Sequence, residues 1–358
     1  MKKIVCWNLG LLVSGLFVCE LMFGSWLRGG GLGFVHVPRD LVLQHDVSEF
    51  RSGGGVVRYS RDKWGLRGSH EDPSQINVLT IGGSTTDELY SDDSETWSSR
   101  LQDRFARAGI PAIIGNAGVN GHSTVGHIYS LEAWLSRIPR LKPKVILYFI
   151  GINDVALPSQ SGHDAIVAVG TWPRLLRYMI NNSALIRLIR IIRGSIRATN
   201  IRVAYGWVSS SLRRYGPYPK IDPSQYRRQL SDYGARVKRL SDLSFERGAL
   251  PVFISQRRGD AFLRGDALFA SDREALRFRQ VQNLYNQELL RICRLSKAVC
   301  IDLASKIELS EVDFFDRIHT TPAGSDKIAA FLFERLDGAV RAQLLDWKTN
   351  SNPGTTKR

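Results

Sequence analysis

Two short stretches, far apart in the chain, contain the residue types of an acyl-transfer site. Gly82-Gly83-Ser84-Thr85 places a hydroxyl on the turn that leaves a hydrophobic strand. Asp316-Arg317-Ile318-His319 places a carboxylate and an imidazole three residues apart in a loop. A serine becomes a nucleophile when a histidine accepts its proton and a carboxylate orients that histidine. We therefore expect Ser84 to act as nucleophile, His319 as base and Asp316 as the orienting acid.

Two motifs between these stretches supply hydrogen-bond donors for an oxyanion. Asn116-Ala117-Gly118-Val119-Asn120-Gly121 can bring a bare backbone N–H close to a substrate, and Gly151-Ile152-Asn153-Asp154 offers a side-chain amide. Such donors stabilise the negative charge that develops during acyl transfer. Each motif alone is equally typical of an ordinary turn, in which glycine and asparagine are common. All four motifs together favour catalysis, with Gly121 and Asn153 as oxyanion donors.

The surrounding pattern predicts an α/β fold. Buried strands are expected at 76–81, 112–115, 145–150, 250–255 and 299–303, and helices at 97–108, 123–137, 272–295 and 322–345, the last with Thr321 as N-cap and Pro322 as first residue. Continuous apolar strands separated by helices are typical of a parallel sheet covered on both faces. Ligands of such sheets bind beyond the carboxyl ends of the strands, which is where all four motifs fall.

The chain divides into four predicted regions. Residues 1–28 are expected to form a membrane anchor or a signal peptide, and the glycine-rich, irregular residues 29–75 a juxtamembrane linker and lead-in. Residues 76–345 form the predicted catalytic domain, with a basic insertion at about 155–222. Residues 346–358 are expected to be a disordered tail.

Residues 4–27 are almost uninterruptedly apolar and follow Lys2 and Lys3. A helix of this length, at about 1.5 Å per residue, spans a bilayer core of about 30 Å. Glu20 lies near its far end, where a carboxyl can reach the interface. A cleaved signal peptide is the alternative, although no good small-x-small site closes the run. The two lysines favour a single-pass protein of the cell membrane, with its catalytic domain on the periplasmic or extracytoplasmic side.

The net charge of +15 favours an anionic partner, and much of it comes from one segment. Residues 165–221 contain ten Lys and Arg and no Asp or Glu. Within 172–197, basic residues at helical spacing alternate with Leu and Ile, which is typical of a membrane-interface helix. A cap helix packed on the domain is the alternative, and no nucleic-acid-binding module is present, so we expect no nucleic acid. The regularly spaced basic residues are Arg187, Arg190, Arg193 and Arg197.

The cysteines and histidines give no sign of a metal site. Cys6 and Cys19 lie in the apolar run, and Cys293 and Cys300 lie between a predicted helix and strand. An exported domain permits a disulfide between the second pair, with two buried free thiols as the alternative. No Cys/His array has zinc spacing. We therefore expect neither a metal nor a cofactor.

The four motifs resemble those of the SGNH (GDSL-like) hydrolase superfamily over about residues 76–345. This resemblance implies a three-layer α/β/α sandwich with a flavodoxin-like sheet, and an oxyanion hole made by the Ser84 amide, the Gly121 amide and the Asn153 side chain. Gly121 matches the family glycine better than Gly118. The matched positions are Ser84 in the first block, Gly121 in the second, Asn153 in the third, and Asp316 and His319 in the last.

The chain departs from the GDSL pattern at Gly83 and Thr85, which replace Asp and Leu. This form, with the lead-in around 65–68, resembles a membrane-anchored bacterial branch often linked to cell-surface polysaccharides. We therefore predict an anchored serine esterase that hydrolyses small O-acyl groups, acetyl foremost, on an exported glycan or related metabolite. An O-acyltransferase using the same site is one alternative. A non-catalytic glycan-binding or scaffold component of the cell envelope is the other, favoured by the positive charge.

Overall fold

The computed structural model describes residues 2–24, 26, 32, 37–48, 54–156, 171–186, 188, 189, 192 and 212–350. Its centre is a five-stranded sheet in the order β10-β7-β5-β3-β4, in which every neighbouring pair is parallel. This is the flavodoxin-like order, and it confirms the predicted α/β fold. The strands are β3 (Val78–Gly82), β4 (Ile114–Asn116), β5 (Val145–Phe149), β7 (Leu250–Ile254) and β10 (Val299–Ile301).

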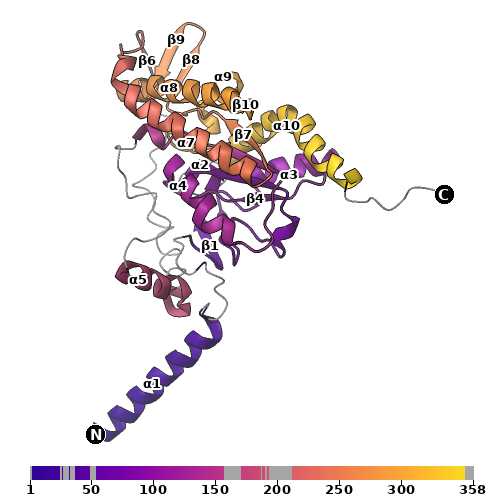
Figure 1. Ribbon diagram of the computed structural model, residues 1–358. Helices are drawn as coiled ribbons and strands as arrows, with labels where there is room; N and C mark the ends of the chain where they lie inside the picture. Colours follow the sequence, from indigo (N-terminus) through magenta and orange to yellow (C-terminus); the bar gives the residue numbers. More distant parts are fainter. Residues whose placement is uncertain are drawn as a thin grey trace, which may run out of the picture.

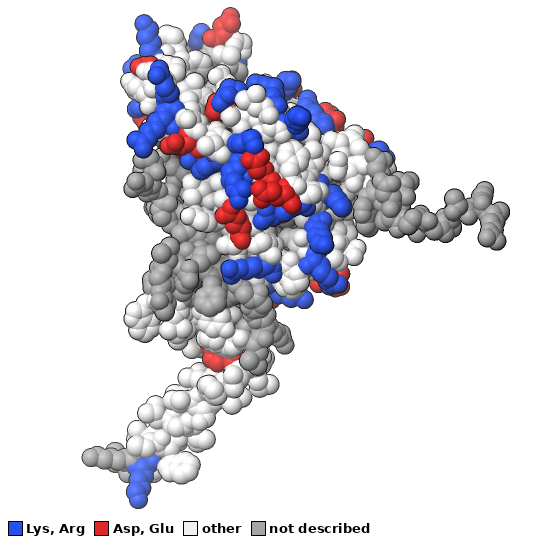
Figure 2. Space-filling model, viewed as in Figure 1, with Lys and Arg blue, Asp and Glu red and all other residues white. Residues whose placement is uncertain are grey.

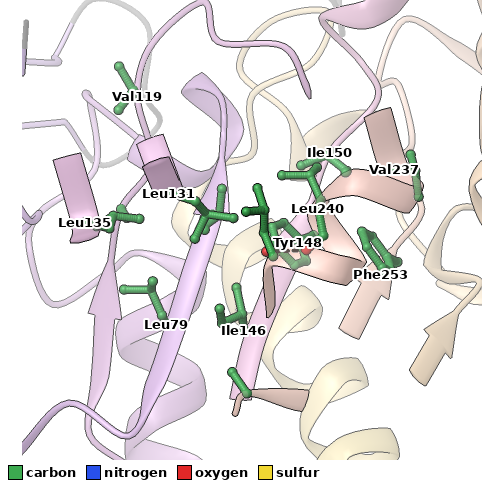
Figure 3. Close-up of a cluster of buried hydrophobic side chains, with 14 of the residues drawn as sticks. Leu79, Val119, Leu131, Leu135, Ile146, Tyr148, Ile150, Val237, Leu240 and Phe253 are labelled. Carbon is green, nitrogen blue, oxygen red and sulfur yellow. Dashed lines mark hydrogen bonds between the residues drawn. The ribbon is translucent and has the colours of Figure 1, made fainter. Parts of the chain in front are cut away.

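Helices cover both faces of this sheet (Figure 1). Strands β3 and β5 are therefore buried along their whole length. One core contains Trp134, Tyr148, Tyr233 and Leu289, and Figure 3 shows part of it. The other core contains Trp97 among its fully buried residues. The first face is covered by α4 (Thr124–Tyr129), α7 (Arg227–Glu246) and α8 (Arg273–Leu295), and the second by α3 (Trp97–Arg107) and α10 (Pro322–Asn350).

Most predicted elements lie within two residues of their expected bounds, but the helix expected at 123–137 is divided. After α4, the chain forms a π-helical turn (Ser130–Trp134) and a 3₁₀ turn (Leu135–Arg137). Helix α7 was not predicted. The terminal helix α10 begins at Pro322 as expected and continues to Asn350, whereas the rest of the predicted tail lies outside the described residues.

Two smaller sheets are also additional to the prediction. The lead-in, which has no regular period in the sequence, contains an antiparallel hairpin, β1 (Leu41–Asp46) and β2 (Val56–Arg61). An antiparallel sheet joins β6 (Arg213–Tyr215), β9 (Ala267–Ala270) and β8 (Ala261–Arg264). The buried residues of β2 include Ser60 and Arg61, so an apolar pattern could not reveal this strand.

The N-terminal helix α1 (Lys2–Phe23) projects away from the catalytic domain (Figure 1). It is long and apolar enough to cross a membrane, as an anchor or as a signal sequence, and its side chains are exposed. In Figure 2, α1 is almost uncharged beyond its N-terminal end, whereas charges of both signs alternate over the visible face of the domain.

Two further predictions concern the insertion and the cysteines. The insertion contains α5 (Thr171–Asn182), whereas Arg187, Arg190, Arg193 and Arg197 lie outside the described residues. Cys293 and Cys300 form a disulfide, which confirms the expected bridge between the end of α8 and the start of β10. Cys6 and Cys19 are free thiols on α1.

Candidate active site

Three polar side chains from the two ends of the catalytic domain meet at the carboxyl edge of the sheet. The Ser84 Oγ lies 2.7 Å from the His319 Nε2, and the His319 Nδ1 lies 2.6 Å from the Asp316 Oδ2. Ser84 is the first residue of the short helix α2 (Ser84–Asp87), directly beyond strand β3. The hydroxyl, imidazole and carboxylate therefore form one continuous hydrogen-bonded series, which is the arrangement of a serine triad.

The loop that carries Asp316 and His319 holds both side chains in position. The second carboxylate oxygen of Asp316 accepts hydrogen bonds from the backbone N–H of Ile318, at 2.8 Å, and of His319, at 2.7 Å. The Phe315 ring stacks on the imidazole, with centroids 5.7 Å apart and an interplanar angle of 11°. The imidazole is thus held at one edge by a carboxylate and on one face by an aromatic ring. This leaves Nε2 directed at the hydroxyl.

The asparagine after β5 lies directly against the nucleophile turn. Asn153 donates from Nδ2 to the backbone oxygen of His122 at 2.8 Å, which leaves the second amide hydrogen for another acceptor. A Cβ on Gly83 would lie 2.4 Å from this Nδ2 and 3.1 Å from the same His122 oxygen. A side chain at position 83 would therefore require the amide or the nucleophile turn to move, whereas glycine lets the two lie close together.

A buried polar cluster holds the asparagine loop in place. Asp154 accepts hydrogen bonds from the Thr124 hydroxyl at 2.5 Å and from Arg236 at 3.2 Å. Burial raises the pKa of the Asp154 carboxyl to about 6, and these donors act against that rise. Since Thr124 begins helix α4 and Arg236 belongs to α7, the cluster connects the second and third motifs to the helical layer.

The two glycines of the second motif differ in what they contact. A Cβ on Gly118 would lie 2.3 Å from the backbone nitrogen of Asp87, so Gly118 is required for close packing against α2. Gly121 has a φ of +77°, which disfavours any side chain, and open space lies where its Cβ would be. Gly121 is exposed and can therefore contact a substrate, whereas Gly118 has a packing role.

Arg61 and Asp87 belong to the support of the site and were not predicted. Arg61, from strand β2, donates to the Asp87 carboxylate at 2.7 Å and to the backbone oxygen of Gly118 at 2.5 Å. Both side chains are almost fully buried. The guanidinium therefore joins the nucleophile helix to the second motif. In the sequence, Arg61 is an arginine shortly before Gly65 and Gly68, and such a pattern is common in exposed loops, so it did not indicate a buried role.

A small pocket opens beside the triad. Its free volume of about 10 Å³ is roughly that needed for one water molecule. Glu88, at the end of α2, contributes a buried carboxyl to its wall, and burial raises the pKa of this group to about 8. Polar and apolar side chains line the rest. The pocket residues are Ser84, Thr85, Glu88, Leu89, Tyr90, Asn120, Phe315, His319 and Thr320.

No metal site accompanies these residues in the part of the chain that the structure describes, where no three His, Cys, Asp or Glu side chains are grouped closely enough to hold an ion.

The predicted site residues Ser84, Asn153, Asp316 and His319 all lie at the carboxyl edge of the sheet, and Gly121 lies in the loop after β4.

The solved structures that resemble this chain are distant in sequence. TesA is 14% identical over 73% of this chain and 98% of its own, with a TM-score of 0.42. The esterase EstA from Pseudoalteromonas sp. is 12% identical over 74% and 99%, with a TM-score of 0.43. A catalytic mutant of Axe2, an acetylxylan esterase from Geobacillus stearothermophilus, is 13% identical over 72% and 93%, with a TM-score of 0.41.

Among curated proteins, none matches this sequence. The model of the GDSL-like Lipase/Acylhydrolase family matches residues 80–327, which is more than half of the chain and includes all four motifs. The chain therefore belongs to the GDSL-like lipase/acylhydrolase family and is a serine hydrolase.

Proposed function

We propose that this protein is a membrane-anchored serine esterase that removes small O-acyl groups, acetyl foremost, from an exported glycan. The observation that carries the catalytic part is the hydrogen bond of 2.7 Å between the Ser84 hydroxyl and the His319 imidazole. In this proposal Ser84 is the nucleophile, His319 the general base and Asp316 the group that orients and stabilises the imidazolium.

Acylation begins when the Ser84 oxygen attacks the ester carbonyl and its proton passes to His319 Nε2. The carbonyl oxygen becomes an oxyanion, which accepts hydrogen bonds from the Ser84 and Gly121 amides and from the Asn153 side chain. The imidazolium then returns its proton to the alcohol oxygen of the glycan as the C–O bond breaks. The products of this half-reaction are the free hydroxyl and an acyl ester on Ser84.

Deacylation repeats the same steps with water as the nucleophile. His319 accepts a proton from the water, the resulting tetrahedral intermediate uses the same donors, and the proton returns to the Ser84 oxygen as the carboxylic acid leaves. One ester and one water thus give one alcohol and one acid. If a sugar hydroxyl replaces water in this step, the same residues perform acyl transfer.

The narrow pocket supports a small acyl group. Leu89, Tyr90 and Phe315 are among the residues that line the pocket beside Ser84, and its free volume of about 10 Å³ favours a small acyl group over a long fatty acyl chain. The apolar helix α1 and the two lysines at its start support an anchor with the catalytic domain outside the cytoplasm. An exported substrate, such as a cell-surface glycan, fits this location.

Activity-based labelling tests the nucleophile. The full-length protein in detergent should react with a fluorophosphonate probe, and peptide mapping should place the probe on Ser84. Ser84→Ala should remove the label and p-nitrophenyl acetate hydrolysis, whereas Ser136→Ala, at an exposed position, should keep both. Hydrolysis by Ser84→Ala at the wild-type rate would rule out this assignment.

The acyl specificity is tested with a series of substrates. We expect kcat/KM to fall steeply from p-nitrophenyl acetate to the octanoate, and we expect acetic acid to be released from an acetylated oligosaccharide. Mass spectrometry of the oligosaccharide products separates hydrolysis from transfer, because transfer would add an acetyl group to an acceptor sugar.

A further inference from the structure

The carboxylate of Glu20, in the last turn of α1, binds residues from the distant insertion. It accepts hydrogen bonds from the Ser183 hydroxyl at 2.6 Å and from the backbone N–H groups of Ala184 and Leu185, at 2.9 and 3.0 Å. Trp26 donates its indole N–H to the same carboxylate at 3.0 Å. These backbone groups begin a helical stretch, and the first N–H groups of a helix lack intrahelical partners. Glu20 accepts two of them, and the Ser183 hydroxyl accepts the next, from Ile186, at 3.1 Å.

A second contact connects the end of α1 to α5. The Tyr178 ring packs edge-on against Trp26, with centroids 5.9 Å apart, and its hydroxyl donates to the Trp26 backbone oxygen at 3.3 Å. Tryptophan and tyrosine are enriched where a protein crosses from hydrocarbon to the headgroup region. The aromatic pair lies at the level where α1 ends.

The insertion presents two apolar faces that the described part of the protein leaves exposed. In α5, Trp172, Leu175, Leu176 and Met179 recur at helical spacing, with 45–77% of each residue exposed. The following stretch repeats the same spacing and is similarly exposed. Exposed apolar surface of this extent is typical of a membrane or protein contact. The second set is Leu185, Leu188, Ile189 and Ile192, with 42–52% exposed.

The second apolar face lies next to α1. A groove of about 400 Å³ is formed between them, and Leu16, Cys19, Phe23 and Leu188 are among the residues that line it. The exposed apolar surface of the insertion is thus continuous with the helix that is proposed to cross the bilayer. The sequence from 165 to 221 also has ten basic residues and no acidic ones, which complements an anionic lipid surface.

We propose that α1 is retained in the mature protein and that α5 and the described residues 183–186, 188, 189 and 192 lie with it in the outer interfacial layer of the membrane, positioned by Glu20. The partner is an anionic lipid bilayer surface. This inference rests on the anchor in the proposed function but not on the esterase reaction. Cleavage of a signal peptide would remove Glu20 and leave the N–H groups of Ala184 and Leu185 without this acceptor, whereas Ile186 would keep the Ser183 hydroxyl.

Depth-sensitive fluorescence tests the position of the insertion. Single cysteines replace Met179, Leu188 or, as a control of matched exposure on β8, Leu263, in full-length protein with Cys6→Ala and Cys19→Ala. Each carries an NBD probe in vesicles of phosphatidylethanolamine and phosphatidylglycerol. Probes at 179 and 188 should be blue-shifted and quenched by nitroxide lipids, whereas the probe at 263 should be neither.

Two outcomes would overturn the proposal. Probes at 179 and 188 as exposed to water as the probe at 263 would place the insertion in solvent. A blue shift without lipid quenching would mean that protein covers these faces. The esterase rate, measured in the same vesicles, reports separately on the proposed function, because none of the replaced residues contacts the triad.

Glu20 and the retention of α1 are tested in the same system. Glu20→Ala should reduce nitroxide quenching at position 188 severalfold, and Glu20→Gln, which keeps one acceptor oxygen, should reduce it less. Hydrolysis of p-nitrophenyl acetate should be unchanged in both variants. Intact mass of protein from membranes should include α1. A mass lacking these residues, or quenching unaffected by Glu20→Ala, contradicts the proposal.

Discussion

The Asn153 side-chain amide lies where a Cβ on Gly83 would have to be, since that Cβ would come within 2.4 Å of Nδ2. The second glycine of the nucleophile turn thus makes room for the proposed oxyanion donor. A contact under 3 Å requires movement of one group, and the asparagine is also hydrogen-bonded to His122. The relationship couples the first and third motifs directly.

Gly83→Ala should therefore reduce kcat more than it changes KM. Displacing one oxyanion donor costs about a hundred- to a thousandfold in turnover. The measurement is steady-state hydrolysis of p-nitrophenyl acetate, with circular dichroism to confirm folding. Gly338→Ala, in α10 with open space around its Cβ position, is the matched control and should retain wild-type kinetics. Wild-type kcat in Gly83→Ala would show that the close approach is not needed.

Arg61→Met should destabilise the protein by about 3–5 kcal/mol, because it leaves the Asp87 carboxylate buried without its cation. Thermal or urea unfolding in detergent measures this change. Arg58→Met is the control, since Arg58 is half-exposed in its ion pair with Asp93 and should cost about 1 kcal/mol or less. Adding Asp87→Asn to Arg61→Met should restore part of the stability, and no restoration would argue against the isolated charge as the cause.

Glu88 should make stability fall as the pH rises. Burial raises its pKa from 4.5 to about 8, so the folded state holds this proton more tightly than the unfolded state. The contribution is fully present below about pH 4.5 and is lost as the pH rises through about 8, at about 1.4 kcal/mol per pKa unit. Unfolding of wild type and Glu88→Gln between pH 5 and 9 tests this. The wild type should lose stability relative to the variant, and parallel curves would contradict the assignment.

The disulfide should stabilise the catalytic domain although it closes a short loop. Cys293 is fully buried beside β10, and restricting a loop of this length in the unfolded chain contributes about 2.5 kcal/mol. Replacing both Cys293 and Cys300 by Ala should lower the unfolding free energy by about this amount. Cys6→Ala with Cys19→Ala should leave it unchanged, since both lie on α1. Equal stability with and without reductant would show that the bridge has little effect.

The central sheet and the triad could be predicted because their signals are local. Strands such as 145–149 are continuous apolar runs. The first three motifs lie at the ends of strands and the fourth lies in the connection after β10, so a parallel sheet brings them to one edge. Helix α7 was missed although Tyr233, Val237 and Leu240 have helical spacing, because serines and a glycine share its buried face.

The supporting polar residues could not be predicted, because their partners are distant in the sequence. Arg61 and Asp87 form an ion pair across 26 residues, and Gln256 donates to the Thr85 hydroxyl at 2.8 Å across 171 residues. In the sequence each resembles an ordinary surface residue. Only burial in the folded chain turns them into a scaffold. The same applies to Glu20, whose partners lie in the insertion.

The buried position of Leu32 in the core of the catalytic domain limits how far that domain can move from α1. Helix α1 ends at Phe23, and nine residues fully extended reach about 30 Å. With α1 in the bilayer, such a short tether keeps the catalytic domain close to the lipid. The enzyme would then act on acyl groups that are carried close to the membrane and would not reach those deep in a capsule or wall.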